Sequence, residues 1–179
     1  MSGARTDERL GAILARLPEA AKDLKLNLSA VLGSEHLTPA QALGTALAAA
    51  FAAGAPELAQ ALVDDAGERE DLAPLIDDAR AAAALMAMNN VYYRFRHQVG
   101  KESYGKKPAR LRMNRLGKAA TNRLDLELFS LGVSAINGCE RCVQSHEQTV
   151  TEAGLSEDAV HDVVRIAAVV NAVASTLGT

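Results

Sequence analysis

The sequence predicts an all-α fold, and three observations predict it. Aromatic residues are scarce, with three Tyr, three Phe and no Trp among 179 residues, so small aliphatic side chains must fill the interior. Alanine runs at residues 46–50 and 81–84 favour helices, because alanine is the best helix former and packs poorly between sheets. No stretch shows the sustained alternation of apolar and polar residues that marks a half-buried strand.

The N-terminal part contains a lead-in and a first helix. Residues 1–17 are charged and predict a loosely attached helical lead-in to a single domain over residues 18–179. Apolar residues recur at helical spacing over residues 18–32, which predicts a helix that stops at Gly33.

A clear helix start follows at Thr38. Its side chain can cap a helix, Pro39 suits the first helical position, and Gln41 can reach back to complete a capping box. We expect that helix to run to about Gly54, and we expect further helices over residues 56–66 and 72–93.

The next segment, residues 101–123, is called the basic segment below. It holds eight Lys or Arg residues and one acid, Glu102, so its local charge is +7 while the rest of the chain carries −10. Such a segment is usually a solvated connector or a subunit contact, and it could also dock an acidic partner. The net charge of −3 argues against a general nucleic-acid binder, because phosphate contacts require a basic surface.

Three further helices are predicted in the C-terminal part. Asn122 is a suitable N-cap for a helix over residues 123–136, which stops at an Asn-Gly turn. The other two helices are expected over residues 139–154 and 156–176, the last one capped by a serine.

The cysteines give the first chemical information. Only two occur, Cys139 and Cys142, which rules out a disulfide framework and leaves a metal clip or a redox pair. In a helix that begins at Cys139, Cys142 and His146 follow on the same face. The first turn of a helix stabilises a thiolate, and His146 is one turn away from Cys142, close enough to exchange a proton with it.

Three readings of this pattern compete. A dithiol–disulfide centre would use His146 as its acid–base partner. A zinc site would take Cys139, Cys142 and His146 and would require a fourth ligand from Glu127 or another subunit. The third interpretation is a pair of inert buried thiols. The neighbouring His146 argues against it, because an apolar core has no use for an imidazole. Glu127 lies between two leucines of an apolar helix, where we expect its carboxylate to orient or polarise His146.

The other three histidines are weaker candidates. His36 lies in a loop before a cap and His161 lies among acids on a helix, so both are expected at the surface. His97 falls in an Arg-rich stretch and is expected to be structural.

A weak internal repeat connects the two halves of the chain. A shift of 84 residues aligns residues 46–66 with 130–150, which predicts repeats of about 38–93 and 122–176. The first copy has apolar residues opposite the reactive ones, namely Leu43 for Glu127, Ala55 for Cys139, Leu58 for Cys142 and Leu62 for His146.

We expect a cytoplasmic protein without a membrane span. No apolar run follows the charged N-terminus, as a secretory signal would require. The longest apolar run, residues 46–56, is 11 residues long, whereas a membrane span needs about 20. In the cytoplasm a close cysteine pair is more often redox-active or metal-bound than structural.

Five segments together carry a resemblance to a known family. They read AKDLKLNL (21–28), MNNVYYR (88–94), LRMN (111–114), FSLGVSAINGC (129–139) and CVQSHE (142–147). A Glu separated by eleven intervening residues from a C-x-x-C pair, followed after three intervening residues by a His, is specific, whereas a bare C-x-x-C would not be. By these segments the chain resembles the AhpD family of alkylhydroperoxidases, in the larger group that includes carboxymuconolactone decarboxylase.

The resemblance implies an all-helical fold with an internal duplication, assembled as a homotrimer. It also implies a thiol-dependent peroxidase that reduces organic hydroperoxides and serves as reductant for the peroxiredoxin AhpC. Electrons would come from NADH through dihydrolipoamide dehydrogenase and a lipoylated acyltransferase, with dihydrolipoamide as the reducing co-substrate and with no bound cofactor or metal.

The resemblance also implies a role for each site residue. Cys142 would be the peroxidatic thiol that forms a sulfenic acid, and Cys139 the resolving thiol and proton donor that closes a disulfide with it. His146 and Glu127 would form the proton relay. Some members carry a second His directly before the second Cys, where this chain has Arg141. A guanidinium cannot relay protons at neutral pH, although Arg141 can still favour a thiolate electrostatically.

Two other classes of function remain open at this point. A non-catalytic redox adaptor would cycle the same disulfide and pass electrons to a peroxiredoxin without turning over peroxide. A zinc-stabilised structural protein would contain stoichiometric metal and would lose its fold with a chelator.

Overall fold

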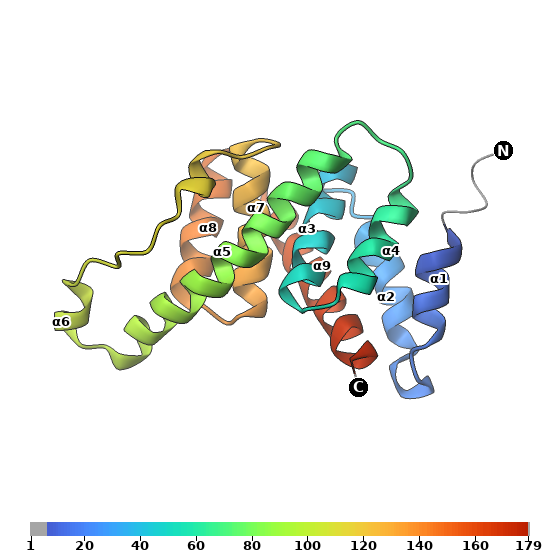
Figure 1. Ribbon diagram of the computed structural model, residues 1–179, viewed down its shortest axis with the longest axis horizontal. Helices are drawn as coiled ribbons and strands as arrows, with labels where there is room; N and C mark the ends of the chain where they lie inside the picture. Colours follow the sequence, from blue (N-terminus) through green and yellow to red (C-terminus); the bar gives the residue numbers. More distant parts are fainter. Residues whose placement is uncertain (1–6, 179) are drawn as a thin grey trace.

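The all-α prediction is confirmed: the computed structural model describes residues 7–178, and they form helices and turns without a strand. The helices are α1 (Asp7–Ala15), α2 (Asp23–Leu32), α3 (Pro39–Ala52), α4 (Pro56–Ala66), α5 (Leu72–Val99), α6 (Glu102–Gly105), α7 (Arg123–Ile136), α8 (Glu140–Glu152) and α9 (Glu157–Leu177). In Figure 1, α1, α2 and α4 lie at one end of the molecule and α6 at the other. The long helix α5 runs between these two ends.

Helices α3 and α7 form the centre of the core. Residues 41–50 of α3 and 128–134 of α7 are buried without interruption. The two helices approach closely at Gly44, where an added β-carbon would overlap the ring of the fully buried Phe129. Glycine is therefore required at this position because the aromatic ring occupies the space that any side chain would need.

Three predicted helix caps are confirmed. Thr38 and Gln41 form the capping box, with the Gln41 amide donating to Thr38 Oγ1 at 3.2 Å and the Thr38 amide donating to Gln41 Oε1 at 3.0 Å. The side chains of Asn122 and Ser156 likewise accept hydrogen bonds from the third residues of α7 and α9. Local side-chain chemistry thus sets where three of the core helices begin.

The duplication is visible in the backbone. Moving α3 by 84 residues places it on α7, and α4 and α5 then fall on α8 and α9. The turns after α3 and α7 match as well, since Gly54 and Gly138 both take a left-handed conformation, with φ of 69° and 62°. Two equivalent side chains even meet, because Gln41 Nε2 donates to Asp125 Oδ1 at 3.0 Å.

The expectation of a loosely attached lead-in is wrong for the part that the structure describes. Helix α1 packs along α4, and Leu10, Ile13 and Leu17 are buried in the core. Its charges are confined to the first three residues of DERLGAILA, and the composition of this short helix alone does not show which face is buried. Residues 1–6 of that lead-in lie outside the described range.

Two predicted boundaries also differ. The helix expected over residues 18–32 is a short 3-10 turn followed by α2, which begins at Asp23. The helix expected to end at residue 93 continues to Val99 and stops at the left-handed Gly100. Arg96, which stacks on Tyr92 one turn earlier, and its polar neighbours hide the helical period because this stretch projects beyond the core.

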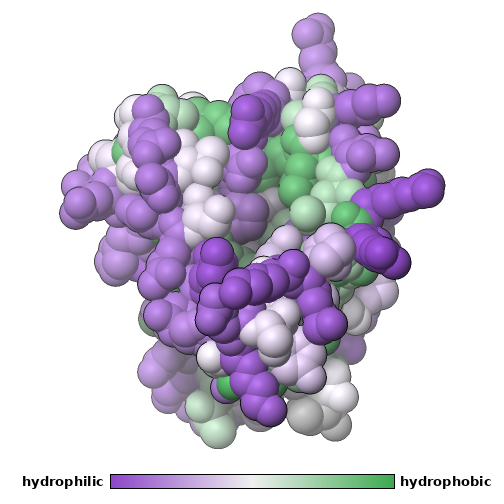
Figure 2. Space-filling model, turned by 90° about the vertical axis from the view of Figure 1, so that its left-hand side faces the viewer, coloured by the Kyte–Doolittle hydropathy of each residue, from purple (hydrophilic) through white to green (hydrophobic). Residues whose placement is uncertain are grey.

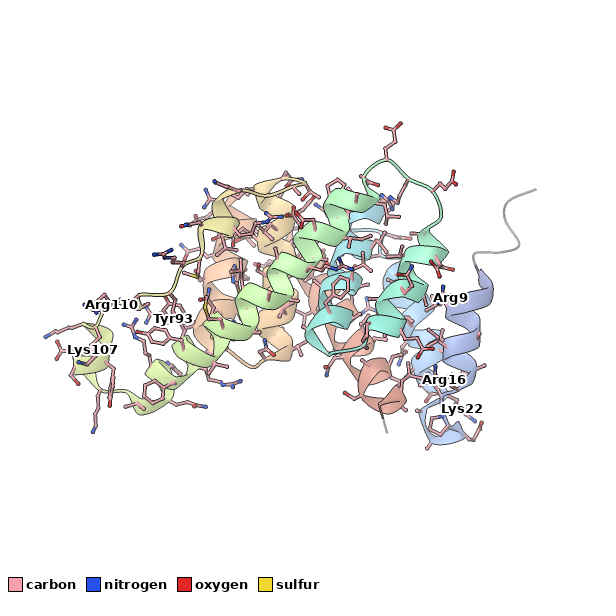
Figure 3. The ribbon with its side chains drawn as sticks, in the orientation of Figure 1. Arg9, Arg16, Lys22, Tyr93, Lys107 and Arg110 are labelled. Atoms are coloured by element: carbon pink, nitrogen blue, oxygen red, sulfur yellow. A yellow bond between two sulfur atoms is a disulfide. The ribbon has the colours of Figure 1, made fainter. Side chains whose placement is uncertain are left out.

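The basic segment forms much of the projecting end of the molecule. It contains α6 and a long connection that returns to α7 (Figure 1). Lys107 and Arg110 lie at this end, whereas Arg9, Arg16 and Lys22 lie at the opposite one (Figure 3). Figure 2 looks onto this end and shows hydrophilic side chains around patches of hydrophobic surface.

One described helix, α9, is long and apolar enough to cross a membrane by length and composition alone. It lies against α2, α3 and α7, and its inward side chains from Ala159 to Ala174 are buried in the core. Its polar residues are also bonded within the molecule, since Ser34 Oγ donates to Asp162 Oδ2 at 2.6 Å. These are the properties of a central core helix.

Candidate active site

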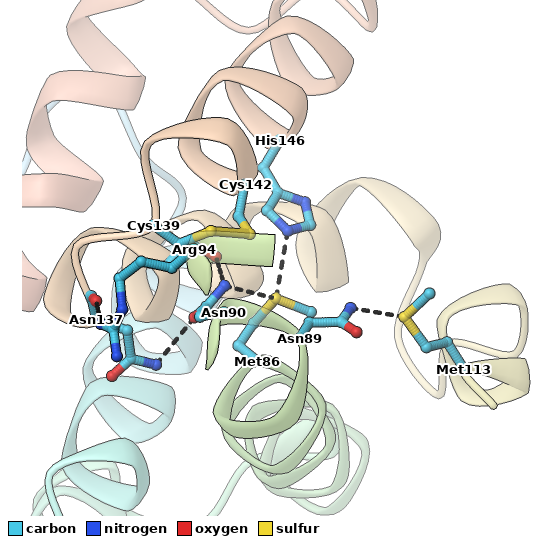
Figure 4. The surroundings of a disulfide bond; sticks show 10 residues. Met86, Asn89, Asn90, Arg94, Met113, Asn137, Cys139, Cys142 and His146 are labelled. Carbon is cyan, nitrogen blue, oxygen red and sulfur yellow. Dashed lines mark hydrogen bonds between the residues drawn. A yellow bond between two sulfur atoms is a disulfide. The ribbon is translucent and has the colours of Figure 1, made fainter. Parts of the chain in front are cut away.

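The cysteine pair lies at the start of α8. Cys139 is the residue before the helix, and its amide donates to the carbonyl of Ser134 at 3.2 Å, across the turn made by Gly138. Cys142 lies in the first turn of α8, with its Cα 5.3 Å from that of Cys139, and a disulfide joins the two side chains (Figure 4). The pair can therefore open and close with little movement of the backbone.

The C-terminal half of α5 braces the turn that precedes Cys139. Asn90 Nδ2 donates to Ser134 Oγ at 3.0 Å, and Asn137 Nδ2 donates to Asn90 Oδ1 at 2.9 Å (Figure 4). The guanidinium of Arg94 donates to the carbonyl of Asn137. Because Asn90 is buried and both ends of its amide are bonded, the position of the turn is fixed from outside the helices that it joins.

Glu127 and His146 form a hydrogen-bonded pair. Glu127 Oε2 lies 2.7 Å from His146 Nδ1, and the two side chains are only 14% and 12% exposed. This hydrogen bond lowers the pKa of Glu127, against the opposing effect of burial, and the positive charge of Arg123 contributes in the same direction. A carboxylate only accepts hydrogen bonds, so the neutral imidazole carries its proton on Nδ1.

The other ring nitrogen of His146 faces a methionine. His146 Nε2 lies 3.4 Å from Sδ of Met86, a fully buried residue of α5 (Figure 4). A thioether has no proton to donate, and Nε2 carries no hydrogen in this tautomer, so the two atoms are in simple contact and Nε2 keeps its capacity to accept a proton.

Cys142, His146 and Glu127 line one cavity of about 410 Å³. Cys142 is 8% exposed, whereas Cys139 is fully buried and does not line the cavity. The remaining walls come from α5, α7, α8 and the basic segment, through Met86, Asn89, Tyr93, Met113, Leu116, Arg123, Arg141, Ser145 and Thr149. The structure thus brings together the four residues singled out from the sequence, with one sulfur at the cavity and the other behind it.

Asn89 belongs to the cavity wall. Its side chain is almost completely buried, and Nδ2 donates to Met113 Sδ at 2.6 Å. No described group donates a hydrogen bond to its Oδ1. The amide therefore ties the basic segment to α5 at the cavity.

Asp78 holds the same segment in place. Its carboxylate is fully buried and accepts hydrogen bonds from Arg115 Nη2 at 2.6 Å, from the Ala120 amide at 2.9 Å and from the Thr121 amide and hydroxyl at 2.8 and 2.6 Å. Burial raises the pKa of Asp78, but these hydrogen bonds outweigh burial and hold it below its ordinary value. The cavity wall is thereby anchored to α5.

The other histidines lie elsewhere. His36 and His161 line a separate hollow on α9, and His97 Nε2 lies 3.2 Å from Glu140 Oε2 at the surface. Within the described part of the chain, no group of three or more His, Cys, Asp and Glu side chains is arranged to hold a metal ion. In the zinc hypothesis Cys139 and Cys142 would bind the metal, but here their sulfur atoms are bonded to each other.

Four residues at the site were not predicted from the sequence: Met86, Asn89, Asn90 and Met113. Three of them lie in segments that carried the family resemblance, and that was their only signal. Their contacts span 24 to 60 residues of sequence, so no local pattern could reveal them.

These features define a class of protein: an all-α, internally duplicated protein with a cysteine pair, an imidazole and a carboxylate at one cavity. The family model that matches, over residues 103–177, is the carboxymuconolactone decarboxylase family.

Proteins that are similar over nearly the whole chain identify the family within this class. A protein of Anaeromyxobacter dehalogenans (strain 2CP-C) is 62% identical over 169 residues, covering 94% of this chain and 90% of its own length. One of Gluconacetobacter diazotrophicus is 50% identical, with 90% and 88% covered, and one of Rhodospirillum centenum is 48% identical, with 93% and 89% covered. All three are named alkyl hydroperoxide reductase AhpD. The chain belongs to the AhpD family.

Proposed function

We propose that this protein is a thiol-dependent peroxidase that reduces alkyl hydroperoxides through Cys139 and Cys142. One observation carries the proposal: Cys142, His146 and Glu127 line the same cavity, whereas Cys139 lies behind it. An attacking thiol needs access to substrate and a partner that moves a proton, and Cys142 has both. The names of the relatives support the same substrate class.

The chemistry then runs in three balanced steps. The Cys142 thiolate attacks the terminal oxygen of the hydroperoxide, the O–O bond breaks, and the alkoxide takes a proton delivered through His146. Cys142 is now a sulfenic acid, and the Cys139 thiol condenses with it to give the disulfide and water. A dithiol, which we propose is dihydrolipoamide, then reduces the disulfide and becomes oxidised itself.

A coupled assay tests the peroxidase proposal. NADH oxidation is followed with dihydrolipoamide dehydrogenase, lipoamide and tert-butyl hydroperoxide. We expect turnover in the wild type and none in Cys142→Ser, whereas Cys139→Ser should still show one burst of sulfenic acid by mass spectrometry. Turnover that survives in Cys142→Ser would refute the assignment of the attacking thiol.

The basic segment supports a lipoylated protein as electron donor. Five of its cations, Lys101, Lys107, Arg110, Arg112 and Lys118, form no ion pair with described residues, and they lie on the segment that forms one wall of the cavity. We propose that an acidic lipoyl domain of the acyltransferase docks on this surface.

Charge reversal separates docking from chemistry. Lys107→Glu combined with Arg110→Glu should slow reduction by a lipoyl domain and leave reduction by free dihydrolipoamide unchanged. Lys22→Glu, at the opposite end of the molecule, is the matched control (Figure 3). Equal losses with both reductants would contradict the docking proposal.

We also propose that this protein reduces the peroxiredoxin AhpC, that it forms a homotrimer and that it is located in the cytoplasm. Val91 and Phe95 are 59% and 45% exposed on the projecting half of α5, where they could contact another copy. A disulfide that must be reduced in every cycle also suits a reducing compartment. Sedimentation gives the oligomeric state, and a coupled assay with AhpC distinguishes direct peroxidase activity from an adaptor that turns over no peroxide alone. Metal analysis of the purified protein tests the zinc alternative.

A further inference from the structure

Two guanidinium groups lie at the cavity of Cys142. Arg123 is the first residue of α7, and Arg141 directly precedes Cys142 in α8; both side chains line the cavity. The Arg141 side chain is exposed and makes no ion pair or hydrogen bond with any described residue. Arg123 is 79% exposed, and its Nε reaches Glu127 Oε1 only at 4.0 Å.

The acids around these guanidinium groups already have partners. Glu127 is hydrogen-bonded to His146, and Glu140 contacts His97 and accepts a hydrogen bond from Gln144 at 3.2 Å. Two guanidinium groups and one carboxylate, that of Glu127, line the cavity, so its lining keeps one net positive charge, and the basic segment adds to it. A concave site with an excess of one sign of charge raises the local concentration of ligands of the opposite sign.

The interior of the cavity has a different character. Met86, Met113, Leu116 and the ring of Tyr93 supply apolar walls, and the volume of about 410 Å³ is that of a small-molecule site. The polar groups of Asn89, Glu127 and His146 lie among these apolar walls, and the cations lie at the mouth. This arrangement matches a molecule with an apolar body and an anionic end. Arginine suits such an end better than lysine, because its planar fork can donate two parallel hydrogen bonds to a carboxylate.

We propose that the preferred substrate is an organic hydroperoxide that carries a carboxylate, which Arg141, assisted by Arg123, binds while the peroxide faces Cys142. This inference rests on the proposed peroxidase function. Both guanidinium groups line the same cavity as the reacting sulfur, so they are within reach of one small molecule. An acidic protein surface would instead contact cations such as Lys107 and Arg110 at the projecting end (Figure 3).

Two matched substrates test the proposal. Cumene hydroperoxide with a para-carboxylate and its methyl ester differ at the far end of the ring, by one negative charge and one methyl group. Reduced protein is mixed with each in a stopped-flow instrument, and the second-order rate constants for Cys142 oxidation are compared. The ratio of the two constants cancels any change in the reactivity of the thiolate, because both substrates meet the same sulfur.

We expect the carboxylate to react about fivefold faster at low ionic strength, the upper end of what an exposed ion pair contributes. Added salt should reduce the ratio, and Arg141→Gln should bring it close to one. Arg16→Gln removes the same charge at the opposite end of the molecule and should leave the ratio unchanged.

The outcomes distinguish failure of the carboxylate preference from failure of the peroxidase function. Equal rates for both substrates in the wild type would overturn the carboxylate preference and leave the peroxidase function standing. No reaction with either substrate would refute the peroxidase function, and the preference with it. A ratio that falls as much in Arg16→Gln as in Arg141→Gln, or an Arg141→Gln variant that is impaired only in reduction by dihydrolipoamide, would also overturn the preference.

Discussion

Replacing Asp78 by Asn should destabilise the protein and loosen one wall of the cavity. The carboxylate accepts four hydrogen bonds from three residues of the basic segment, all of them from a fully buried position. Asparagine keeps one acceptor oxygen and presents an NH2 group where the other stood, so donors that met an acceptor now meet a donor. The same segment supplies Met113 and Leu116 to the cavity.

The size of the loss follows from what is broken. Removing one partner of a buried ion pair costs about 3–5 kcal/mol of unfolding free energy. Arg115 is 28% exposed and also reaches Asp77 Oδ2 at 2.7 Å, so we expect the lower end of that range, about 3 kcal/mol. Asp77 is 66% exposed and bonded to the same Arg115, which makes Asp77→Asn the matched control, with an expected loss of less than about 1 kcal/mol.

Urea unfolding measures both variants, and its pH dependence adds a second check. The pKa of Asp78 is lowered in the folded state, so its ionised form stabilises the fold above the unfolded pKa of about 3.9, and this contribution disappears as the pH falls through the folded pKa. The difference between wild type and Asp78→Asn should therefore shrink below about pH 4. Equal effects of the two variants at neutral pH, or a difference that grows on acidification, would refute the reasoning.

Three further changes have defined outcomes. Gly44→Ala should destabilise the protein by about 1–3 kcal/mol, because the new methyl group overlaps Phe129. In the control Gly132→Ala, the β-carbon would lie 3.4 Å or more from its neighbours, so this variant should be neutral or more stable by up to about 1 kcal/mol. Thermal unfolding of the two variants measures both effects. Glu127→Gln should lower the rate of hydroperoxide reduction about 100-fold. The neighbouring imidazole lowers the pKa of Glu127, so in the pH–rate profile of the wild type the carboxylate should still contribute to the rate below pH 4.5. Asn122→Ala should cost about 1 kcal/mol, seen in urea unfolding, by leaving the first turn of α7 uncapped; an unchanged midpoint would mean that water caps it equally well.

The sequence predicted what depends on neighbouring residues. The capping box at Thr38, the cap at Asn122 and the glycine turns at residues 54 and 138 are determined within a few positions, and the structure has them where they were expected. The pairing of Glu127 with His146 was predictable for a similar reason, because an acid in an apolar helix needs a polar partner.

Features that depend on packing between distant segments were not predictable in this way. Helix α1 buries Leu10 and Ile13, and Leu17 is buried just after it; only the contact of α1 with α4 shows that this part of the chain belongs to the core. Asn90 braces the Asn137 turn from 47 residues away, and Asp78 anchors the basic segment at Ala120 from 42 residues away. A local sequence pattern cannot predict contacts between residues so far apart in the chain.

The duplication explains why chemistry occurs at only one of two similar turns. The backbone from α3 to α4 repeats the backbone from α7 to α8, down to the left-handed glycine, so the turn itself is not specific to the active site. In the first copy Leu58 and Leu62 occupy the positions of Cys142 and His146 and are buried in the core, and α1 packs along α4. In the second copy α8 faces Tyr93 and the loop of Met113 and Leu116, which leave a cavity beside Cys142. The reactive pair therefore depends as much on what covers α8 as on the residues that α8 contains, because a helix packed there as closely as α1 is packed on α4 would exclude the substrate from the same sulfur.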